Sequence, residues 1–264
     1  MNDTTAAVLA RYDRDMREGA LPDGPGARIE RSGGVVRQVA PAHGWNGVLW
    51  SGLDAAATDE DVDAVIAGQI EHYAALGHGF EWKLYGHDLP AGLGRRLLAA
   101  GFSPEPAETL LVAETAEVPL DVEPPAGVRV REVRDAAGVE LLTRVHEAAF
   151  GTDGTQLRRR LLDRLAAEPD SLVAVVAVAG DVPVSSARME LAPGTRFAGL
   201  WGGGTVEGWR GRGLYRALVG YRARLAAERG YPYLQVDATD QSRPILERLG
   251  FVPLTTTTPY VYER

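Results

Sequence analysis

Glycines and arginines gather in one short stretch of the chain, between a predicted strand and a predicted helix. The stretch reads WRGRGLYR and supplies two glycines and three arginines: Gly211, Gly213, Arg210, Arg212 and Arg216. Glycine lets backbone N–H groups approach an anion closely, and the amino end of a helix adds a partial positive charge. Arginine side chains at the same end add full charges. This combination of residue types is suited to holding a pyrophosphate.

A glycine loop before a helix also occurs in nucleotide-binding proteins, so the spacing of its glycines and its position in the chain must be compared with theirs. Dinucleotide folds use G-x-G-x-x-G early in the chain, and triphosphate-binding loops end in Gly-Lys-Ser or Gly-Lys-Thr. Here the loop follows four predicted strands, and no Gly-Lys-Ser/Thr occurs. Both nucleotide interpretations are therefore disfavoured.

The second half of the chain predicts the elements that position this loop. Its segments alternate between half-buried or fully apolar strands and amphipathic helices, separated by glycine and proline turns. We expect strands at 128–133, 172–179, 184–191, 197–205, 233–237 and 255–262, and helices at 136–150, 156–167, 214–229 and 244–249.

The first half repeats the end of that pattern. Its helix at 58–76 opens with Thr58 and Asp61 spaced like a capping box, and a strand follows at 80–85. The segment RRLLAAGF at 95–102 then resembles RPILERLGF at 243–251. A duplication explains the spacing of about one domain length, and chance similarity of two short amphipathic segments is the alternative.

A proline-rich acidic segment separates the two halves. We therefore predict a first domain at 1–114, a linker at 115–127 and a second domain at 128–264.

The second half resembles the GNAT superfamily of acyl-CoA-dependent N-acyltransferases. The family's pyrophosphate motif is Arg/Gln-x-x-Gly-x-Gly/Ala, which this chain matches through Arg210 and Gly213 and departs from at Tyr215. The order of elements in 128–262 and the LGF at 249–251 also match. The resemblance implies an α/β (α+β) protein of two GNAT-like domains, each a mixed central sheet flanked by helices. The first half, which has no counterpart of RGRGLY, would be a degenerate copy without a cofactor.

The resemblance also implies direct transfer of an acetyl group from acetyl-CoA to a primary amine within a ternary complex. A gap between the strands 197–205 and 233–237 would take the pantetheine arm. A backbone N–H near Val206 would hydrogen-bond the thioester carbonyl and stabilise its developing charge. The residues expected to bind the cofactor are Thr205, Val206, Arg210, Gly211, Arg212, Gly213, Leu214 and Tyr215.

The acid and base of the reaction are less well defined. The family often uses a tyrosine on its last helix to protonate the thiolate, and Leu246 stands at that position. The hydroxyls nearby in sequence belong to Tyr215, Tyr260 and Tyr262. Carboxylates at strand ends are the candidate catalytic residues: Glu207, on position alone, then Glu190 and Asp237. A solvated carboxylate at a strand end is the alternative for each.

Histidines, tryptophans and a run of arginines have simpler interpretations. We expect His146 to pack at the core, and Trp45, Trp50 and Trp82 to pack rather than line an apolar pocket. The run 158–160 should be the solvated side of its helix. The remaining histidines lack metal-ligand spacing, so no metal site is expected: His43, His72, His78 and His87.

Composition limits the classes of partner. The 264 residues carry a net charge of −8, which disfavours a nucleic-acid partner. No apolar run has the length of a membrane span, no signal segment opens the chain, and no cysteine occurs. We expect a cytoplasmic monomer or homodimer that acts on a small-molecule amine or a peptide. A non-catalytic acyl-CoA-binding or scaffold protein is the alternative, suggested by Leu246.

Overall fold

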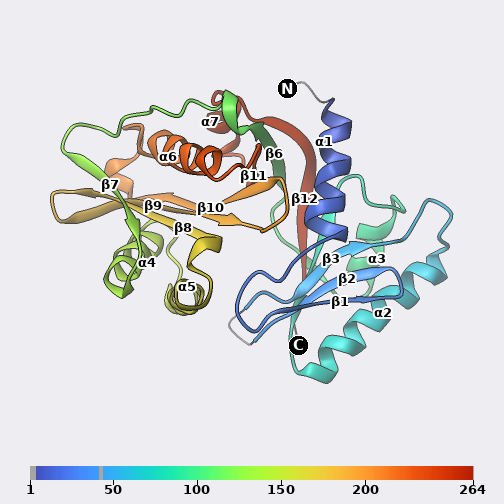
Figure 1. Ribbon diagram of the computed structural model, residues 1–264. Helices are drawn as coiled ribbons and strands as arrows, with labels where there is room; N and C mark the ends of the chain where they lie inside the picture. The colour runs from blue at the N-terminus through green and yellow to red at the C-terminus, as the bar shows by residue number, and fades with distance from the viewer. Residues whose placement is uncertain (1–3, 42–43, 264) are drawn as a thin grey trace. The chain divides into compact units, whose positions relative to one another are not determined.

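The computed structural model describes residues 4–41 and 44–263, which form two compact units (Figure 1). Unit 1 comprises Leu111–Val236 and Gln241–Val252, and unit 2 comprises Asn2–Leu110, Asp237–Asp240 and Pro253–Arg264. The units are defined by contacts and interleave along the chain. The domain limits predicted from the sequence divide the chain into two continuous halves, whereas each unit includes segments from both halves. Those limits therefore stay a prediction.

The strands of unit 1 form a sheet in the order β11-β10-β9-β8-β7. Neighbours are antiparallel except β10 and β11, which run parallel. Their bounds are β7 Val128–Val133, β8 Leu172–Ala179, β9 Val182–Leu191, β10 Phe197–Thr205 and β11 Tyr233–Ala238. A further strand, β6 (Glu108–Glu114), crosses the division between the units.

Helices cover both faces of this sheet. Figure 1 shows α4 (Ala136–Phe150) and α5 (Thr155–Ala167) below the strands, and α6 (Leu214–Glu228) and α7 (Arg243–Glu247) above them. Because both faces are covered, β8 reads as an uninterrupted apolar run, and seven of its eight residues are buried. Asp135 caps α4 by accepting from the Gly138 N–H, and Gly151 ends it in the left-handed region.

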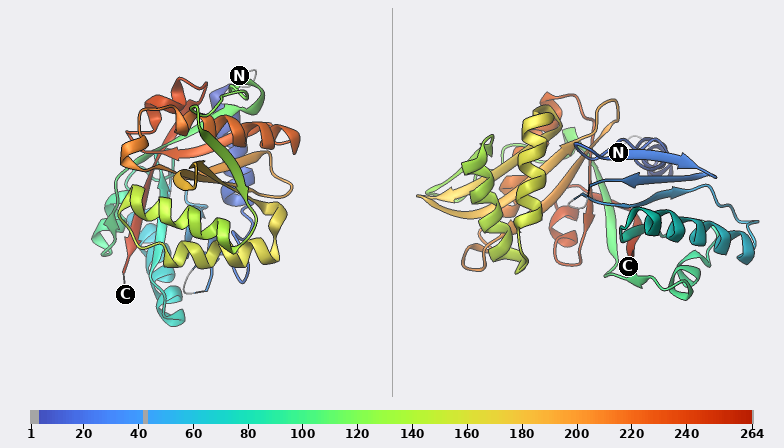
Figure 2. Two further views of the ribbon diagram at one scale, coloured as in Figure 1. Left: turned by 90° about the vertical axis from the view of Figure 1, so that its left-hand side faces the viewer. Right: turned by 90° about the horizontal axis from the view of Figure 1, so that it is seen from below.

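Unit 2 begins with α1 (Thr5–Tyr12), which continues into a π-helix, Asp13–Glu18. Its sheet has the order β1-β2-β3-β4-β12, with β5 on β12. The strands are β1 Arg28–Ser32, β2 Val35–Val39, β3 Gly47–Ser51, β4 Phe80–Tyr85, β5 Ser103–Pro104 and β12 Val252–Tyr262, and the further helices are α2 Asp59–Leu76 and α3 Leu93–Ala99. Figure 2 shows α1 and α2 on opposite faces of the β1–β3 strands.

The predicted capping box of α2 is confirmed. The Thr58 side chain accepts from the Asp61 N–H, and the Asp61 carboxylate accepts from the Thr58 N–H. The predicted stripe then packs on the sheet, with Val62, Ile66 and Tyr73 all at most 1% exposed. The elements predicted for the second half are also confirmed within about three residues at each end.

The last strand makes pairings that the sequence did not predict. β12 was expected to close the second half, but within unit 2 it pairs antiparallel with β4, from Thr257 opposite Tyr85 to Tyr262 opposite Phe80. Its aromatic side chains pack with Phe80 and Phe102. The elements α1, β1, β2 and β3 were also not predicted.

Candidate functional site

A bulge in β10 is the first feature of the site in unit 1. The register with β9 shifts between Trp201 and Gly204, so Gly202 and Gly203 have no partner of their own across the ladder. Gly202 is left-handed, with φ of +57°, a conformation that suits glycine. The bulge leaves backbone groups of β10 free of the regular ladder.

The parallel partner of β10 is paired over a short stretch only. Matched residues run from Phe197 and Tyr233 to Gly199 and Gln235, whereas β10 continues to Thr205. The pairing of the two strands therefore ends at Gly199, just before the bulge. The sequence predicts that these strands separate, and a gap for the pantetheine arm between them stays a prediction.

The glycine loop follows β10 and opens α6. Gly211 and Gly213 have φ of +74° and +84°, and nothing lies within 4 Å of a Cβ placed on Gly211. Gly213 is the N-cap of α6, and no side chain caps the first turn. The N–H groups of that turn therefore have no side-chain cap, and they form the positive end of a 15-residue helix.

The three arginines of the loop are exposed. Arg210 is held by the Thr205 and Ala149 carbonyls, at 3.1 and 3.2 Å, and the Arg212 guanidinium lies 4.7 Å above the Trp209 ring. These contacts fix the loop and keep its charges at the helix end. The residues present fit a pyrophosphate group, because two positive-φ glycines, an uncapped helix N-terminus and three exposed arginines lie together here.

The donor to the thioester carbonyl was expected near Val206, and the structure shows where the N–H of that residue points. The Val206 N–H already donates to the Val184 carbonyl oxygen at 3.0 Å, so it is engaged within the sheet. The irregular part of β10 lies earlier, at Gly202 and Gly203. The sequence did not reveal this shift because a bulge depends on how two strands match, and GGG has no side-chain pattern to show it.

Two of the predicted carboxylates belong to unit 1. Glu207 is exposed in the 3₁₀ turn Glu207–Trp209, between the end of β10 and the glycine loop. Glu190, on β9, is held by two guanidinium groups, at 3.3 Å from Arg164 and 3.4 Å from Arg188. An acceptor molecule would have to compete with both arginines for the Glu190 oxygens, so Glu207 is the more accessible carboxylate.

Asp237, the third predicted carboxylate, makes its contacts within unit 2. Its side chain is 1% exposed, is ion-paired with Lys83 and accepts from the Thr257 hydroxyl at 3.4 Å. Burial opposes the charge of Lys83, but Asp237, Tyr85 and Glu81 together outweigh burial and raise the pKa of Lys83. The structure therefore gives Asp237 a structural partner.

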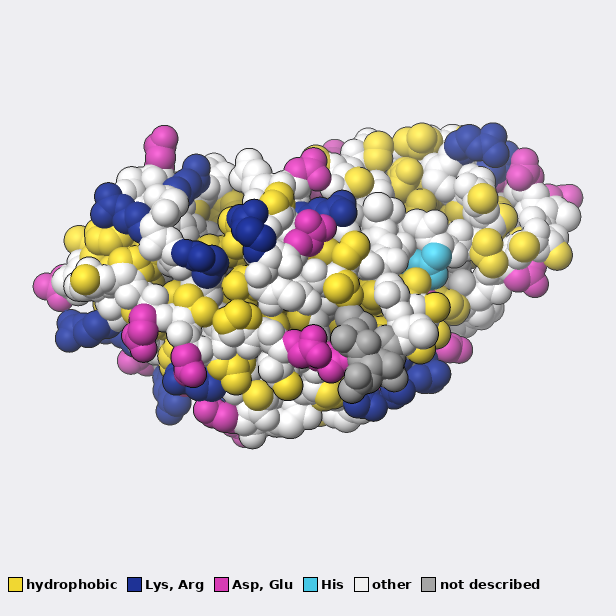
Figure 3. All heavy atoms as spheres, turned by 90° about the horizontal axis from the view of Figure 1, so that it is seen from above, with side chains coloured by type: hydrophobic (Ala, Val, Ile, Leu, Met, Phe, Trp, Pro, Cys, Tyr) yellow, Lys and Arg dark blue, Asp and Glu magenta, His cyan; other side chains and the backbone are white. Residues whose placement is uncertain are grey.

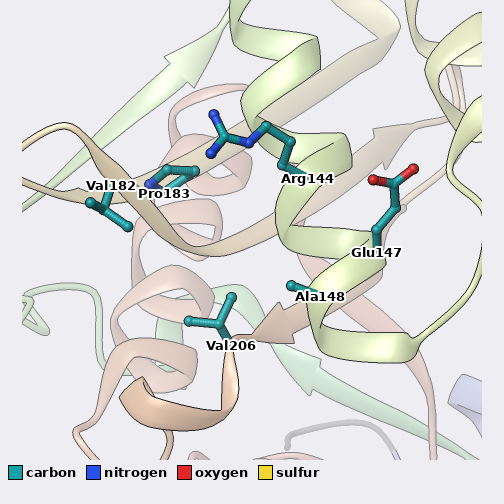
Figure 4. A pocket seen from close by; sticks show the side chains of 6 residues that line it. All are labelled: Arg144, Glu147, Ala148, Val182, Pro183 and Val206. Atoms are coloured by element: carbon teal, nitrogen blue, oxygen red, sulfur yellow. The ribbon is translucent and has the colours of Figure 1, made fainter.

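A hollow of about 380 Å³ borders the end of β10. Figure 4 shows Arg144, Glu147 and Ala148 on its α4 side and Val206 beneath them. Val182 and Pro183, at the start of β9, complete its lining. The hollow has aliphatic walls, and two charged side chains line it beside the candidate site: the acidic Glu147 and the basic Arg144.

Unit 2 has a similar pair of parting parallel strands, but its fork is filled. β3 and β4 are matched only at Gly47 with Glu81 and at Val48 with Trp82. Beyond that, the Arg17 side chain donates to the Leu49 carbonyl at 3.1 Å and, from Nη2, to Asp88 at 2.6 Å. Its guanidinium also lies 3.7 Å above the Tyr85 ring.

The remaining predicted residues are distributed as follows. Trp82 is buried, Trp45 donates to Glu81, and Trp50 lies beside Arg17. The arginines at 158–160 are exposed, as predicted.

His146 was predicted to pack in the core, and this is wrong because its side chain is only half-buried. One of its ring nitrogens lies 3.2 Å from the Thr152 hydroxyl. Burial and the nearby Arg188 lower the pKa of His146. His43 lies outside the described residues.

Several negative findings concern the described part of the chain alone. No group of three or more His, Cys, Asp or Glu residues there could hold a metal ion. None of the helices described has the length and apolarity to cross a membrane. Acidic and basic side chains are mixed on the face that Figure 3 shows.

The fold and the loop together define the class: this chain has the fold of the GCN5-related N-acetyltransferases. A GCN5-related N-acetyltransferase from Kribbella flavida is similar over 98% of this chain and 94% of its own, with a TM-score of 0.70 and 21% identity. A functionally unknown conserved protein from Staphylococcus epidermidis is similar over 96% and 97%, with a TM-score of 0.67 and 13% identity. A tandem GNAT protein from the clavulanic acid biosynthesis pathway is similar over 92% and 85%, with a TM-score of 0.62 and 14% identity. Neither a family model nor a curated protein matches the sequence.

Proposed function

We propose that the protein is an N-acetyltransferase that transfers the acetyl group of acetyl-CoA to a primary amine of a small molecule or peptide. The observation that carries the proposal is the glycine loop Gly211–Gly213, which opens α6 directly after a bulged strand that parts from its parallel neighbour. The similar fold of tandem GNAT proteins supports it. The donor would supply the activated acyl group.

The residues of unit 1 would each have a defined role. The N–H groups at the start of α6, with Arg210, Arg212 and Arg216, would hold the pyrophosphate. A backbone N–H of the bulge, at Gly202 or Gly203, would donate to the carbonyl oxygen on which charge develops. The amine must lose a proton to attack, and Glu207 is the exposed carboxylate nearest in sequence to the loop.

Unit 2 would not bind a donor of its own. Arg17 fills the fork between β3 and β4, and the segment that follows β3 lacks the glycines and arginines of the unit 1 loop. We therefore expect one molecule of acetyl-CoA per chain.

Calorimetric titration with acetyl-CoA and free CoA tests the proposal. Wild type should bind in the micromolar range, and Gly213→Asp should lose binding because a carboxylate would face the pyrophosphate. Gly230→Asp is the matched control: Gly230 also has a positive φ, +79°, and lies at the other end of α6 with open space around it. An amine screen with thiol release as the signal then tests transfer. Binding without turnover of any amine would favour an acyl-CoA-binding protein.

A further inference from the structure

Arg188, on β9, lies beside the bulge of β10. It stands opposite Trp201 in the ladder between the two strands, and its side chain is 20% exposed. A Cβ placed on Gly202 would come within 2.6 Å of Arg188 Nη1. Because Gly202 carries no side chain, the guanidinium lies directly against the part of the backbone that we expect to bind the thioester carbonyl.

Most of the Arg188 guanidinium has no hydrogen-bond partner. Its Nε donates to Glu190 at 3.4 Å, and within the described residues neither Nη1 nor Nη2 has an acceptor. Neither of these two nitrogens is enclosed by the protein. The parallel N–H groups of a guanidinium bind a carboxylate through two hydrogen bonds at once. The free edge of Arg188 therefore fits a carboxylate.

The charges around Arg188 favour an anion. Glu190 also pairs with Arg164 at 3.3 Å, so two guanidinium groups share this carboxylate. A third guanidinium, that of Arg222, donates to the Arg188 carbonyl oxygen at 2.8 Å and forms no ion pair within the described residues. His146 on α4 is neutral near pH 7, because burial and Arg188 lower its pKa. A further carboxylate would therefore meet an excess of positive charge.

We propose that Arg188 binds a carboxylate of the acceptor, which is then an amino acid or a similar compound with its amine and carboxylate a few bonds apart. This rests on the proposed function. The acetyl group carries no charge, so the carboxylate belongs to the acceptor, and the contact of Arg188 with the bulge requires the short separation. The amine nitrogen bonds to the acetyl carbon, and the carbon–sulfur bond breaks with its electron pair going to sulfur. The nitrogen gives a proton to a base, and the thiolate takes one from water.

Binding of the reaction products tests the proposal without turnover. N-acetyl amino acids and their amides, which differ only in the carboxylate, are titrated by calorimetry with and without CoA. At least one acid should bind wild type about 10–100-fold more tightly than its amide, because hydrogen bonds to a charged group contribute this much. Arg188→Met should remove the preference, and Arg188→Lys should keep part of it. Arg134→Met, at a side chain that is 79% exposed, is the control and should keep the whole preference.

Several outcomes of this titration would overturn the proposal. Equal affinities of wild type for each acid and its amide would do so whether or not Arg188→Met folds. A preference that survives in folded Arg188→Met would do so too, as would the absence of binding by every N-acetyl amino acid. If wild type binds no CoA, the proposed function fails instead, and the comparison of acids with amides in the absence of CoA still decides the role of Arg188.

A carboxylate can also enter on the acyl group of the donor, and succinyl-CoA tests this source. With acetyl-CoA, Arg188→Met should lower kcat/KM for an amino acid by about 10–100-fold and change it little for the matching amide. With the amide as acceptor, wild type and Arg188→Met should use succinyl-CoA equally well. If Arg188→Met instead impairs succinyl transfer to the amide and leaves acetyl transfer to the amino acid unchanged, Arg188 binds the donor and the acceptor assignment is wrong.

Discussion

The ring of Tyr215 occupies the space that a side chain at Gly203 would need: a Cβ there would lie 2.7 Å from Cε2 and 3.4 Å from Cδ2. On the other side of the same strand, a Cβ on Gly204 would lie 2.8 Å from Phe150 Cε2 and 3.0 Å from Ala149 Cβ. Gly203 therefore packs against α6, and the next residue, Gly204, packs against α4. Two elements approach the β10 backbone closely because these positions carry no side chains.

Gly203→Ala should destabilise unit 1. The added methyl group forces the Tyr215 ring out of its place, and overpacking of this kind costs about 1–3 kcal/mol. Chemical denaturation measures the loss, with Gly208→Ala as the control because nothing lies within 4 Å of a Cβ there. Combining Gly203→Ala with Tyr215→Ala should recover part of the loss. If the two effects simply add, the contact does not set the stability of the bulge.

Leu246→Ala should reduce stability. The side chain is fully buried in α7, and removing it leaves a cavity at a cost of about 2–5 kcal/mol. Leu98→Ala, at a leucine that is 47% exposed, is the control and should change little. A large loss of turnover with an unchanged melting curve would contradict a purely structural role for Leu246.

The sequence was most informative where local patterns decide the structure. The period of α4, the apolar run of β8 and the capping box of α2 each follow from neighbouring residues, so their elements could be predicted. The glycine loop could be placed for the same reason. The pairing of β12 with β4 joins residues about 170 positions apart, and nothing local in TTTTPYVY identifies its partner.

The site was less predictable than the fold, because contacts decide it. Asp237 ends a strand in the predicted position, yet Lys83 occupies its carboxylate. Arg222 lies in α6 and is 1% exposed, and nothing in its neighbouring residues indicated that it would be buried.

Arg17→Met should destabilise unit 2 strongly. Arg17 is 1% exposed and forms ion pairs with Asp88 and Asp13, at 2.6 and 2.8 Å. Burial alone would lower the Arg17 pKa, but Asp88, Tyr85 and Asp13 together raise it. Removing Arg17 leaves the Asp88 carboxylate, whose side chain is 7% exposed, without its cation, which costs about 3–5 kcal/mol.

Denaturation of Arg17→Met is compared with Arg28→Met, whose side chain is 55% exposed. The exposed substitution should change stability by less than about 0.5 kcal/mol. Calorimetry should still show one acetyl-CoA per chain for the folded Arg17→Met protein, because unit 2 lacks a pyrophosphate loop. A second binding event would mean that Arg17 alone keeps unit 2 from binding the donor.

The free energy of unfolding should fall as the pH rises from the ordinary pKa of a glutamate to the raised pKa of Glu108. Burial, together with the charge of Asp237, raises the pKa of Glu108 from 4.5 to about 7. Because the folded state holds this proton more tightly than the unfolded state, the stabilisation is complete below about pH 4.5 and is lost by about pH 7. Glu108 is partly exposed, so solvent screening limits the effect to about 1–2 kcal/mol.

Glu108→Gln should remove this dependence, because the amide does not titrate. Free energies of unfolding measured from pH 5 to pH 8 should decline less for Glu108→Gln than for wild type. Glu60→Gln, at an exposed position on α2, should keep the wild-type slope. If Glu108→Gln and wild type decline in parallel, Glu108 ionises in the folded protein as it does in the unfolded chain, and this carboxyl is not the source of the pH dependence.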